Sequence, residues 1–137
     1  MAGGRISRSE NMRRIKSKGM SPELAVRQLV HRMGHRYRLH RRDLPGTPDL
    51  VFGPARKALF VHGCFWHGHD DPRCRRGHVP RSNENYWWPK LLRNKERDQR
   101  NIAVLEDSGW RVLVIWECET RDRQKLEAAL SGFLGAR

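Results

Sequence analysis

The sequence lacks any apolar stretch long enough to cross a membrane, and its first residues are polar throughout. A spanning helix requires about 20 consecutive apolar residues, and a secretion signal requires a shorter apolar run behind a charged stub. Neither pattern occurs, so we expect a cytoplasmic protein with no membrane partner. At 137 residues the chain can bury one core but not two, which predicts a single domain.

Acidic residues are also scarce. Fifteen Asp and Glu stand against 28 Lys and Arg, so the formal net charge is +13, far from the balance of a typical soluble enzyme. Such an excess of positive charge favours a polyanionic partner, and nucleic acid is the natural one. A generic basic surface, such as ribosomal proteins carry, would bind nucleic acid too, so the chemistry has to be inferred from individual residues.

Cysteine is scarce as well: three residues cannot all pair within one chain, and a reducing compartment disfavours disulfides. Cys64, His69 and Cys74 lie in the aperiodic stretch 63–82, and Cys118 follows an apolar run. Three thiolates and one imidazole form the closed tetrahedral set typical of structural Zn²⁺. The alternative is that the cysteines are ordinary small buried residues. The histidines that compete with His69 as fourth ligand are His62, His67 and His78.

Hydrophobic periodicity and capping residues predict an α/β fold. Ser21 is a helix N-cap, and Gly34 and Gly109 are placed to end helices. The run 110–117 is almost continuously apolar, which predicts a strand buried on both faces, and Thr120 is placed to cap the last helix. The order is α-β-β-β-α-β-α around a mixed central sheet. The other expected elements are helices over 22–33 and 89–108 and strands over 36–39, 49–52 and 57–62.

A possible catalytic acid begins the second predicted strand, where Asp49 follows a proline, and His62 ends the next strand. Nucleases of the restriction-endonuclease type hold Mg²⁺ at such strand ends, because Mg²⁺ prefers a few oxygen ligands and keeps waters that can attack a phosphodiester. The usual Glu-x-Lys is replaced here by Phe60-Val61-His62. His62 and His67 are candidates for proton transfer or phosphate stabilisation. A simple turn residue is the alternative interpretation of Asp49.

Two further acids could complete such a site. Asp98 lies seven residues after Leu91 and seven before Leu105, on the helix face expected to be buried, where a carboxylate needs a partner. Glu23 is the other candidate. It lies in the first turn of the first helix, and favourable interaction with the helix dipole is its alternative explanation.

Large aromatic side chains occur in polar, basic surroundings, at Phe65 and Trp66 in the loop and over 86–88 before the long helix. Rings in such places suggest base stacking or intercalation. The alternative is that they pack in the core, which we expect for one of Trp87 and Trp88.

The first 20 residues carry six Lys and Arg but few large apolar side chains, so they cannot pack a core by themselves. They form either a frayed tail or an arm that orders on DNA. In the second case Met12 is available as an apolar wedge between base pairs.

Five stretches contain specific motifs: LPGTPD over 44–49, FVHGCFWHGH over 60–69, NKERD over 94–98, GWRVLVIWEC over 109–118 and SENMR over 9–13. Together they closely resemble the very-short-patch-repair (Vsr) family of mismatch endonucleases. The likeness covers nearly the whole chain, and the segment HGCFWH is its most specific part.

The resemblance implies a restriction-endonuclease-like, PD-(D/E)XK-related fold with structural Zn²⁺ and Mg²⁺-dependent activity. The enzyme would nick the phosphodiester 5′ of a thymine mispaired with guanine, the lesion left when 5-methylcytosine deaminates, and so initiate very short patch repair. It would act as a monomer on double-stranded DNA containing a T·G mismatch, in the nucleoid, with a mismatch-repair protein as a candidate partner. An arm over 1–20 would precede an endonuclease domain over 21–137.

The resemblance also implies roles for individual residues. Asp49 and the backbone carbonyl of Val61 would hold Mg²⁺, while His62 and His67 assist the phosphate chemistry. Glu23 would position His67 or a water, and Asp98 would join by contacting another residue of the site rather than the ion or the substrate. The zinc ligands would be Cys64, His69, Cys74 and Cys118. The DNA contacts would be a wedge of Phe65, Trp66 and Trp87 in one groove, Met12 in the other, Lys90 and Asn94 at the mispair, and Asn11 and Arg13 in the arm.

The chain departs from the family pattern in places. Val61 stands where a threonine is expected, which matters little if its carbonyl is the ligand, and Gly68 replaces a histidine in the zinc loop. Two other classes of protein stay open. One is a non-catalytic module that recognises distorted DNA, against which Asp49 with His62 argues. The other is a histidine-metal hairpin nuclease, against which the long apolar strand and the helix carrying Asp98 argue.

Overall fold

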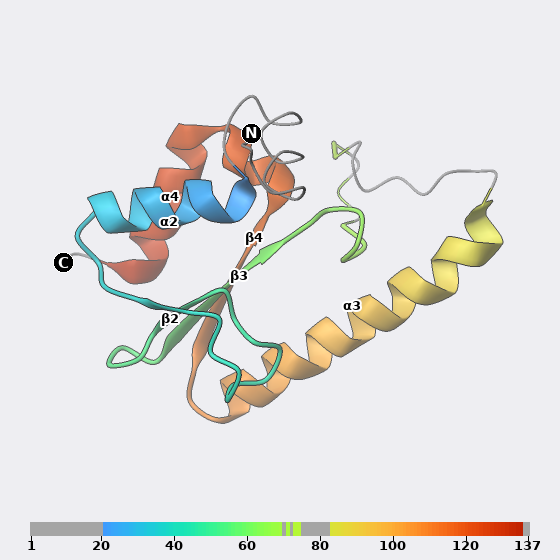
Figure 1. The fold of residues 1–137 in the computed structure, drawn as a ribbon, viewed down its shortest axis with the longest axis horizontal. Helices are drawn as coiled ribbons and strands as arrows, with labels where there is room; N and C mark the ends of the chain where they lie inside the picture. Colours follow the sequence, from blue (N-terminus) through green and yellow to red (C-terminus); the bar gives the residue numbers. More distant parts are fainter. Residues whose placement is uncertain (1–20, 70, 72, 75–82, 136–137) are drawn as a thin grey trace, which may run out of the picture.

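The computed structural model describes residues 21–69, 71, 73–74 and 83–135 (Figure 1). The predictions for the arm over 1–20, with Asn11, Met12 and Arg13, and for His78 fall outside these residues. The elements are α2 (Pro22–Arg32), β1 (Arg38–Leu39), β2 (Leu50–Phe52), β3 (Lys57–His62), α3 (Glu84–Asp107), β4 (Arg111–Trp116), the 3₁₀ helix η3 (Glu117–Arg121) and α4 (Arg123–Leu134).

The strands of the described residues form one mixed sheet in the order β1-β2-β3-β4. The β1–β2 and β2–β3 pairs are antiparallel, and β3 pairs with β4 in parallel. A parallel pair needs a crossover connection, and α3 supplies it. The predicted order of elements and the mixed sheet are therefore confirmed. The β3–β4 register sets His62 opposite Trp116.

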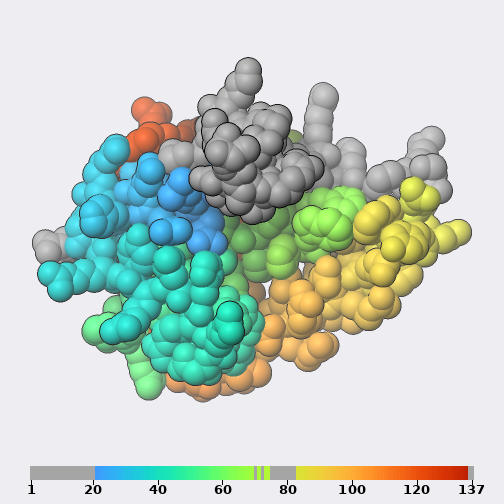
Figure 2. Space-filling view, in the orientation of Figure 1, coloured from blue at the N-terminus to red at the C-terminus, as the bar shows by residue number. Residues whose placement is uncertain are grey.

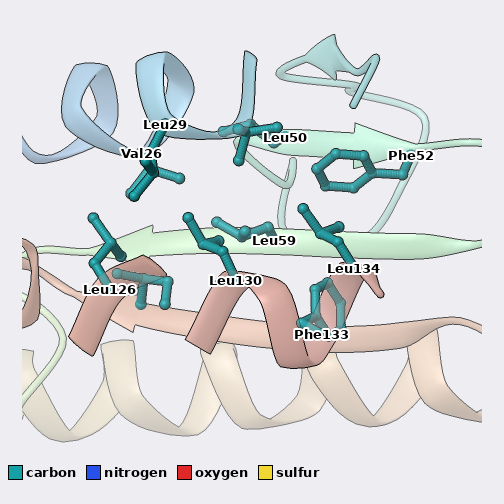
Figure 3. Packing of buried hydrophobic residues seen from close by; sticks show 11 residues of the cluster. Val26, Leu29, Leu50, Phe52, Leu59, Leu126, Leu130, Phe133 and Leu134 are labelled. Carbon is teal, nitrogen blue, oxygen red and sulfur yellow. The ribbon is translucent and has the colours of Figure 1, made fainter. Parts of the chain in front are cut away.

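Helices cover both faces of the sheet, with α2 and α4 on one side and α3 on the other (Figure 1). Side chains alternate along β3, so Leu59 joins the core with α2 and α4 while Ala58 and Phe60 pack toward Leu105 of α3. Figure 3 shows the first core, where side chains of α2, β2, β3 and α4 point toward one another. Its buried members are Val26, Leu29, Val30, Leu50, Phe52, Leu59, Ile115, Leu126, Leu130, Phe133 and Leu134.

Several predicted element ends are correct. The Ser21 hydroxyl accepts the backbone N–H of Leu24 and so caps α2. Gly34 and Gly109 follow α2 and α3 with φ of 88° and 91°, a left-handed conformation that favours glycine. The predicted cap of α4 is wrong: Asp122, not Thr120, accepts the N–H of Lys125, because η3 separates the strand from the helix.

Two other expectations are corrected. The helix predicted to begin at Pro89 begins earlier, at Glu84, so Pro89 lies inside α3. The aromatic side chain of Trp87 packs on the loop after β3, which holds the additional turn in place. Strand β4 packs against the cores on both faces of the sheet, through Leu113 and Ile115 on one and Val112 and Val114 on the other, but of its residues only Ile115 is fully buried. Among the described strands it lies at the edge of the sheet, with β3 as its neighbour. In the described part of the chain, no helix is long and apolar enough to cross a membrane.

Candidate active site and metal centre

The parallel strands β3 and β4 end side by side, and the chemistry-bearing residues gather at this edge of the sheet. The loop carrying Cys64, His67 and His69 follows β3, while η3 with Cys118 follows β4. Residues 54 positions apart therefore meet: the backbone N–H of Cys118 donates to Sγ of Cys64 at 3.4 Å.

A Cys₃His cluster forms here. Ligand atoms of Cys64, His69, Cys74 and Cys118 all lie within 4.8 Å of one another, so the cluster could hold a metal ion. Sγ of Cys118 lies 3.6 Å from Nδ1 of His69, and the N–H of His69 donates to the carbonyl of Cys64 at 2.9 Å, closing the loop. The competing histidines His62 and His67 belong to a different cluster.

The Cys₃His cluster is suited to a cation. Burial is the largest cause that raises the pKa of the Cys64 thiol, to about 12, and burial also raises the pKa of Cys118. A thiolate at this place therefore needs a neighbouring positive charge, which a bound metal ion supplies. Three sulfur donors and one imidazole fit Zn²⁺ in chemistry and number.

A second cluster contains His62, His67 and Asp98. Nδ1 of His67 donates to Oδ2 of Asp98 at 2.5 Å, and the rings of His62 and His67 stack with centroids 3.9 Å apart and planes 4° apart. Burial and, next, the neighbouring His67 lower the pKa of His62 to about 4, so His62 is neutral at physiological pH. Because Asp98 holds Nδ1–H of His67, the Nε2 atom is left as the proton acceptor.

A third cluster contains Glu23, His40 and Asp49. Nε2 of His40 lies 3.1 Å from Oε1 of Glu23 and 3.7 Å from Oδ1 of Asp49. The other oxygen of Asp49, Oδ2, accepts the backbone N–H of Val61 at 2.7 Å. Burial is the main cause that raises the pKa of Asp49, and the negative charge of Glu23 adds to it. A metal cation would favour the ionised carboxylate.

His40 is the residue that sequence reasoning missed. The signal was present in the strand register, because β1 ends at Leu39 opposite Leu50, which places His40 opposite Asp49. The backbone N–H of His40 donates to the carbonyl of Asp49 at 3.1 Å. Its φ is 48°, a left-handed conformation that costs a non-glycine residue about 1–3 kcal/mol.

The predicted catalytic residues thus divide into two groups. Asp49 and Glu23 lie together, whereas His62 and His67 form their own cluster with Asp98. Val61 connects the two groups: its N–H donates a hydrogen bond to Asp49, and the next residue in the chain is His62. Asp98 contacts His67, as expected of a residue that acts through another side chain of the site. Glu23 contacts His40 and Arg27 rather than His67, one of the two partners expected for it.

Aromatic rings connect the second cluster with the Cys₃His cluster. The ring of Trp116 stacks on His69, with centroids 4.1 Å apart and planes 9° apart, and meets His62 edge-on at 5.3 Å. His62 in turn stacks on His67. The packing of these four rings couples the position of the imidazoles to that of the loop that carries the Cys₃His cluster.

The three rings that were predicted to form an aromatic wedge lie together. Phe65, Trp66 and Trp87 make mutual edge-to-face contacts with ring centroids 5.1–5.7 Å apart, and 57 % of Trp66 is exposed. Figure 2 shows the green segment after β3 lying against the yellow N-terminal part of α3. The side-chain amide of Asn94 donates to the carbonyl of Trp66 at 2.9 Å. The Lys90 ammonium lies 4.9 Å from the ring centroid of Tyr86. Of the neighbouring tryptophans, Trp87 is half-buried and Trp88 is exposed.

The fold is that of a mixed α/β domain whose site lies where two parallel strands end. It resembles the catalytic domain of the homing endonuclease I-Bth0305I, with a TM-score of 0.58 and 22% sequence identity over 84% of this chain and 94% of that one, a likeness of fold. The chain belongs to the Vsr family of DNA mismatch endonucleases, whose family model matches residues 4–73. The family resemblance of the motifs is thereby confirmed.

Curated relatives agree with this assignment. The type II nicking enzyme V.XorIIP of Xanthomonas oryzae pv. oryzae is 54% identical over 90% of this chain and 88% of its own length. The type II nicking enzyme V.NmeAIP of Neisseria meningitidis serogroup A is 41% identical over 85% and 81%. The DNA mismatch endonuclease Vsr of Escherichia coli is 40% identical over 89% and 76%. The protein is therefore a DNA nicking endonuclease.

Proposed function

We propose that this endonuclease nicks the phosphodiester 5′ of a thymine mispaired with guanine and thereby initiates very short patch repair of deaminated 5-methylcytosine. The observation that carries the proposal is the arrangement around Val61. Its N–H binds the Asp49 carboxylate on one side, and the chain continues directly into His62, which stacks on the His67–Asp98 pair. A carboxylate for a metal and an oriented imidazole therefore lie beside the same strand end.

The proposed catalytic ion is Mg²⁺, held by Asp49 and the backbone carbonyl of Val61. The site fits the ion in donor chemistry, because hard carboxylate and carbonyl oxygens are the ligands that Mg²⁺ prefers. When bound, Mg²⁺ would neutralise phosphate charge and make a coordinated water more acidic. Glu23, whose carboxylate faces Asp49 across His40, would hold this water. In this arrangement histidines take the place of the lysine of a PD-(D/E)XK site.

Proton transfer is assigned to the second cluster. His67 would accept a proton at Nε2, while Asp98 fixes its ring and stabilises the imidazolium that results. His62 is neutral, so it can donate a hydrogen bond to the phosphate without carrying a charge that would compete with the ion. Its stacking on His67 fixes the two rings relative to each other.

A structural Zn²⁺ is proposed for Cys64, His69, Cys74 and Cys118. Of the described residues between 63 and 74 only Cys64 and Cys74 are buried, and a closed four-ligand site would supply folding free energy to this loop. Because Phe65 and Trp66 follow Cys64 directly, the ion would also hold the aromatic wedge rigidly.

Mismatch recognition is proposed to use intercalation. Phe65, Trp66 and Trp87 would enter from one groove, and Met12 from the other, with Asn11 and Arg13 in the same arm. A T·G pair stacks less stably than a Watson–Crick pair, so wedging the duplex there costs less. Lys90 would face the mispair, and Asn94 would brace the wedge through the Trp66 carbonyl. The monomer would act in the nucleoid, with a mismatch-repair protein as candidate partner.

The test is strand-specific cleavage of end-labelled duplexes that carry T·G in every flanking context, with matched T·A duplexes, in Mg²⁺ and in EDTA. We expect a Mg²⁺-dependent nick immediately 5′ of the mispaired thymine and none in EDTA. Equal nicking of T·A duplexes would contradict mismatch specificity. Binding to T·G without a nick in either condition would contradict the catalytic assignment.

A further inference from the structure

His40 lies between the two carboxylates of the third cluster and has no role in the function proposed above. Its Nε2 atom is 3.1 Å from Oε1 of Glu23 and 3.7 Å from Oδ1 of Asp49. The side chains of Glu23, His40 and Asp49 are 28 %, 49 % and 22 % exposed, so the cluster is accessible to an ion from solvent.

The backbone holds His40 in this position from two directions. Its N–H is bound to the carbonyl of Asp49, and its φ of 48° turns the chain away from the direction of β1. Glu23 comes from the first turn of α2, where Ser21 caps the helix. Three separate segments of the chain therefore place one donor atom each within 4.8 Å of the other two.

The donor spacing is compatible with a metal site, and the His40–Glu23 separation is also that of a hydrogen bond. Ligands about 2.1 Å from an octahedral ion and at right angles to one another lie about 3 Å apart. The two measured separations, 3.1 Å and 3.7 Å, are close to this value, and all three ligand atoms lie within 4.8 Å of one another. Two carboxylates and one neutral imidazole would carry a net charge of −2, which matches a divalent cation.

We infer that His40 is a ligand of the catalytic ion, completing a Glu23–His40–Asp49 site. This inference rests on the proposed function and extends it: Glu23 would bind the ion directly instead of through a water, and the ion would be held by a nitrogen donor as well as by oxygen. Mn²⁺ and Mg²⁺ both favour oxygen ligands, but Mn²⁺, as a transition ion, accepts an imidazole nitrogen more readily than Mg²⁺. The consequence is a preference of this endonuclease for Mn²⁺ over Mg²⁺ that depends on one side chain.

The test is Mn²⁺ binding to the zinc-loaded full-length chain, followed through the electron paramagnetic resonance signal of free Mn²⁺. Mn²⁺ does not compete for a thiolate-rich zinc site. We expect His40→Gln to weaken Mn²⁺ binding about tenfold or more, and Mg²⁺ binding, measured by competition, by less than about threefold. His31→Gln is the matched control, since His31 is an exposed histidine of α2 outside the cluster, and it should leave both affinities unchanged.

A spectroscopic measurement distinguishes direct coordination of the ion by His40 from a purely electrostatic effect of His40 on ion binding. Electron spin echo modulation from an imidazole nitrogen should be present on Mn²⁺ bound to the wild-type protein and to His62→Gln, and lost in His40→Gln. Modulation that persists in His40→Gln, or unchanged Mn²⁺ affinity in that variant, overturns the inference.

The two proposals fail differently. If Asp49→Asn abolishes Mn²⁺ binding while His40→Gln leaves both affinity and modulation unchanged, the ion is where the proposed function puts it and only the role of His40 is wrong. If Asp49→Asn retains full Mn²⁺ affinity, the ion is elsewhere and both proposals are wrong.

Discussion

The Nδ1 atom of His67 lies 2.5 Å from Oδ2 of Asp98, although 31 residues separate them and one lies on a loop, the other in the middle of a long helix. The contact joins the loop after β3 to α3 and fixes the imidazole orientation. It also satisfies a half-buried carboxylate on the inner face of α3. This pair is therefore the most direct place to test proton transfer.

Asp98→Asn should lower the single-turnover nicking rate about 100-fold or more, because an amide cannot stabilise the imidazolium of His67. Mismatch binding, followed by fluorescence anisotropy, should change by less than about threefold. Asp107→Asn, an exposed acid at the end of the same helix, is the matched control and should retain the wild-type rate. A wild-type rate in Asp98→Asn would remove the pair from the mechanism.

Asp49→Ala should abolish nicking while leaving mismatch binding nearly intact, because it removes the proposed ion ligand but not the aromatic wedge. Asp43→Ala is a suitable comparison, since Asp43 is an exposed acid in the same loop, paired with Arg41. Cleavage and binding would be measured on the same T·G duplex. Loss of both to the same extent in Asp49→Ala would show that Asp49 is structural.

Cys118→Ser should lower the melting temperature and the zinc content together, because a structural ion contributes its binding free energy to folding. Elemental analysis of the purified protein and thermal unfolding followed by circular dichroism measure the two quantities. A variant with wild-type zinc content and melting temperature would show that Cys118 is not a ligand.

Trp66→Ala should reduce discrimination between T·G and T·A duplexes about tenfold, since a base–aromatic contact is worth about 1–3 kcal/mol. Trp88→Ala provides the control: Trp88 is 54% exposed, close to the 57% of Trp66, but its ring is not among the three that pack on one another in the wedge. Equal effects of the two substitutions would indicate a general loss of surface affinity and would refute a specific wedge.

His62 should make stability depend on pH in a defined direction. Burial and His67 lower its pKa in the folded protein from 6.5 to about 4. The folded state therefore binds the proton less well than the unfolded state, and the stabilisation present above pH 6.5 is lost as the pH falls toward 4. Denaturant unfolding at about pH 7 and pH 5 should show a smaller loss of stability in His62→Gln than in the wild-type protein. An identical loss in both proteins would contradict the shift.

Local patterns in the sequence were sufficient for much of the fold. The Ser21 cap, the glycines after α2 and α3 and the order of elements depend on backbone preferences within a few residues, and the structure has them as predicted. The errors at α3 and β4 have a different origin. Packing of Trp87 on the loop after β3 supports the part of α3 that precedes Pro89, and the edge position of β4 limits its burial. Both effects come from contacts between elements and not from local backbone preference.

The same division holds for the candidate site. Residue chemistry alone selected the Cys₃His set, Asp49 and the histidines, because thiols, imidazoles and carboxylates in an otherwise polar loop have few structural uses. Only the tertiary structure decided that His69 faces the cysteines while His62 and His67 face Asp98. It also brought His40 between Glu23 and Asp49. That position results from the pairing of β1 with β2 and from one left-handed residue, and no pattern of residue types along the chain encodes the distance between side chains on different elements.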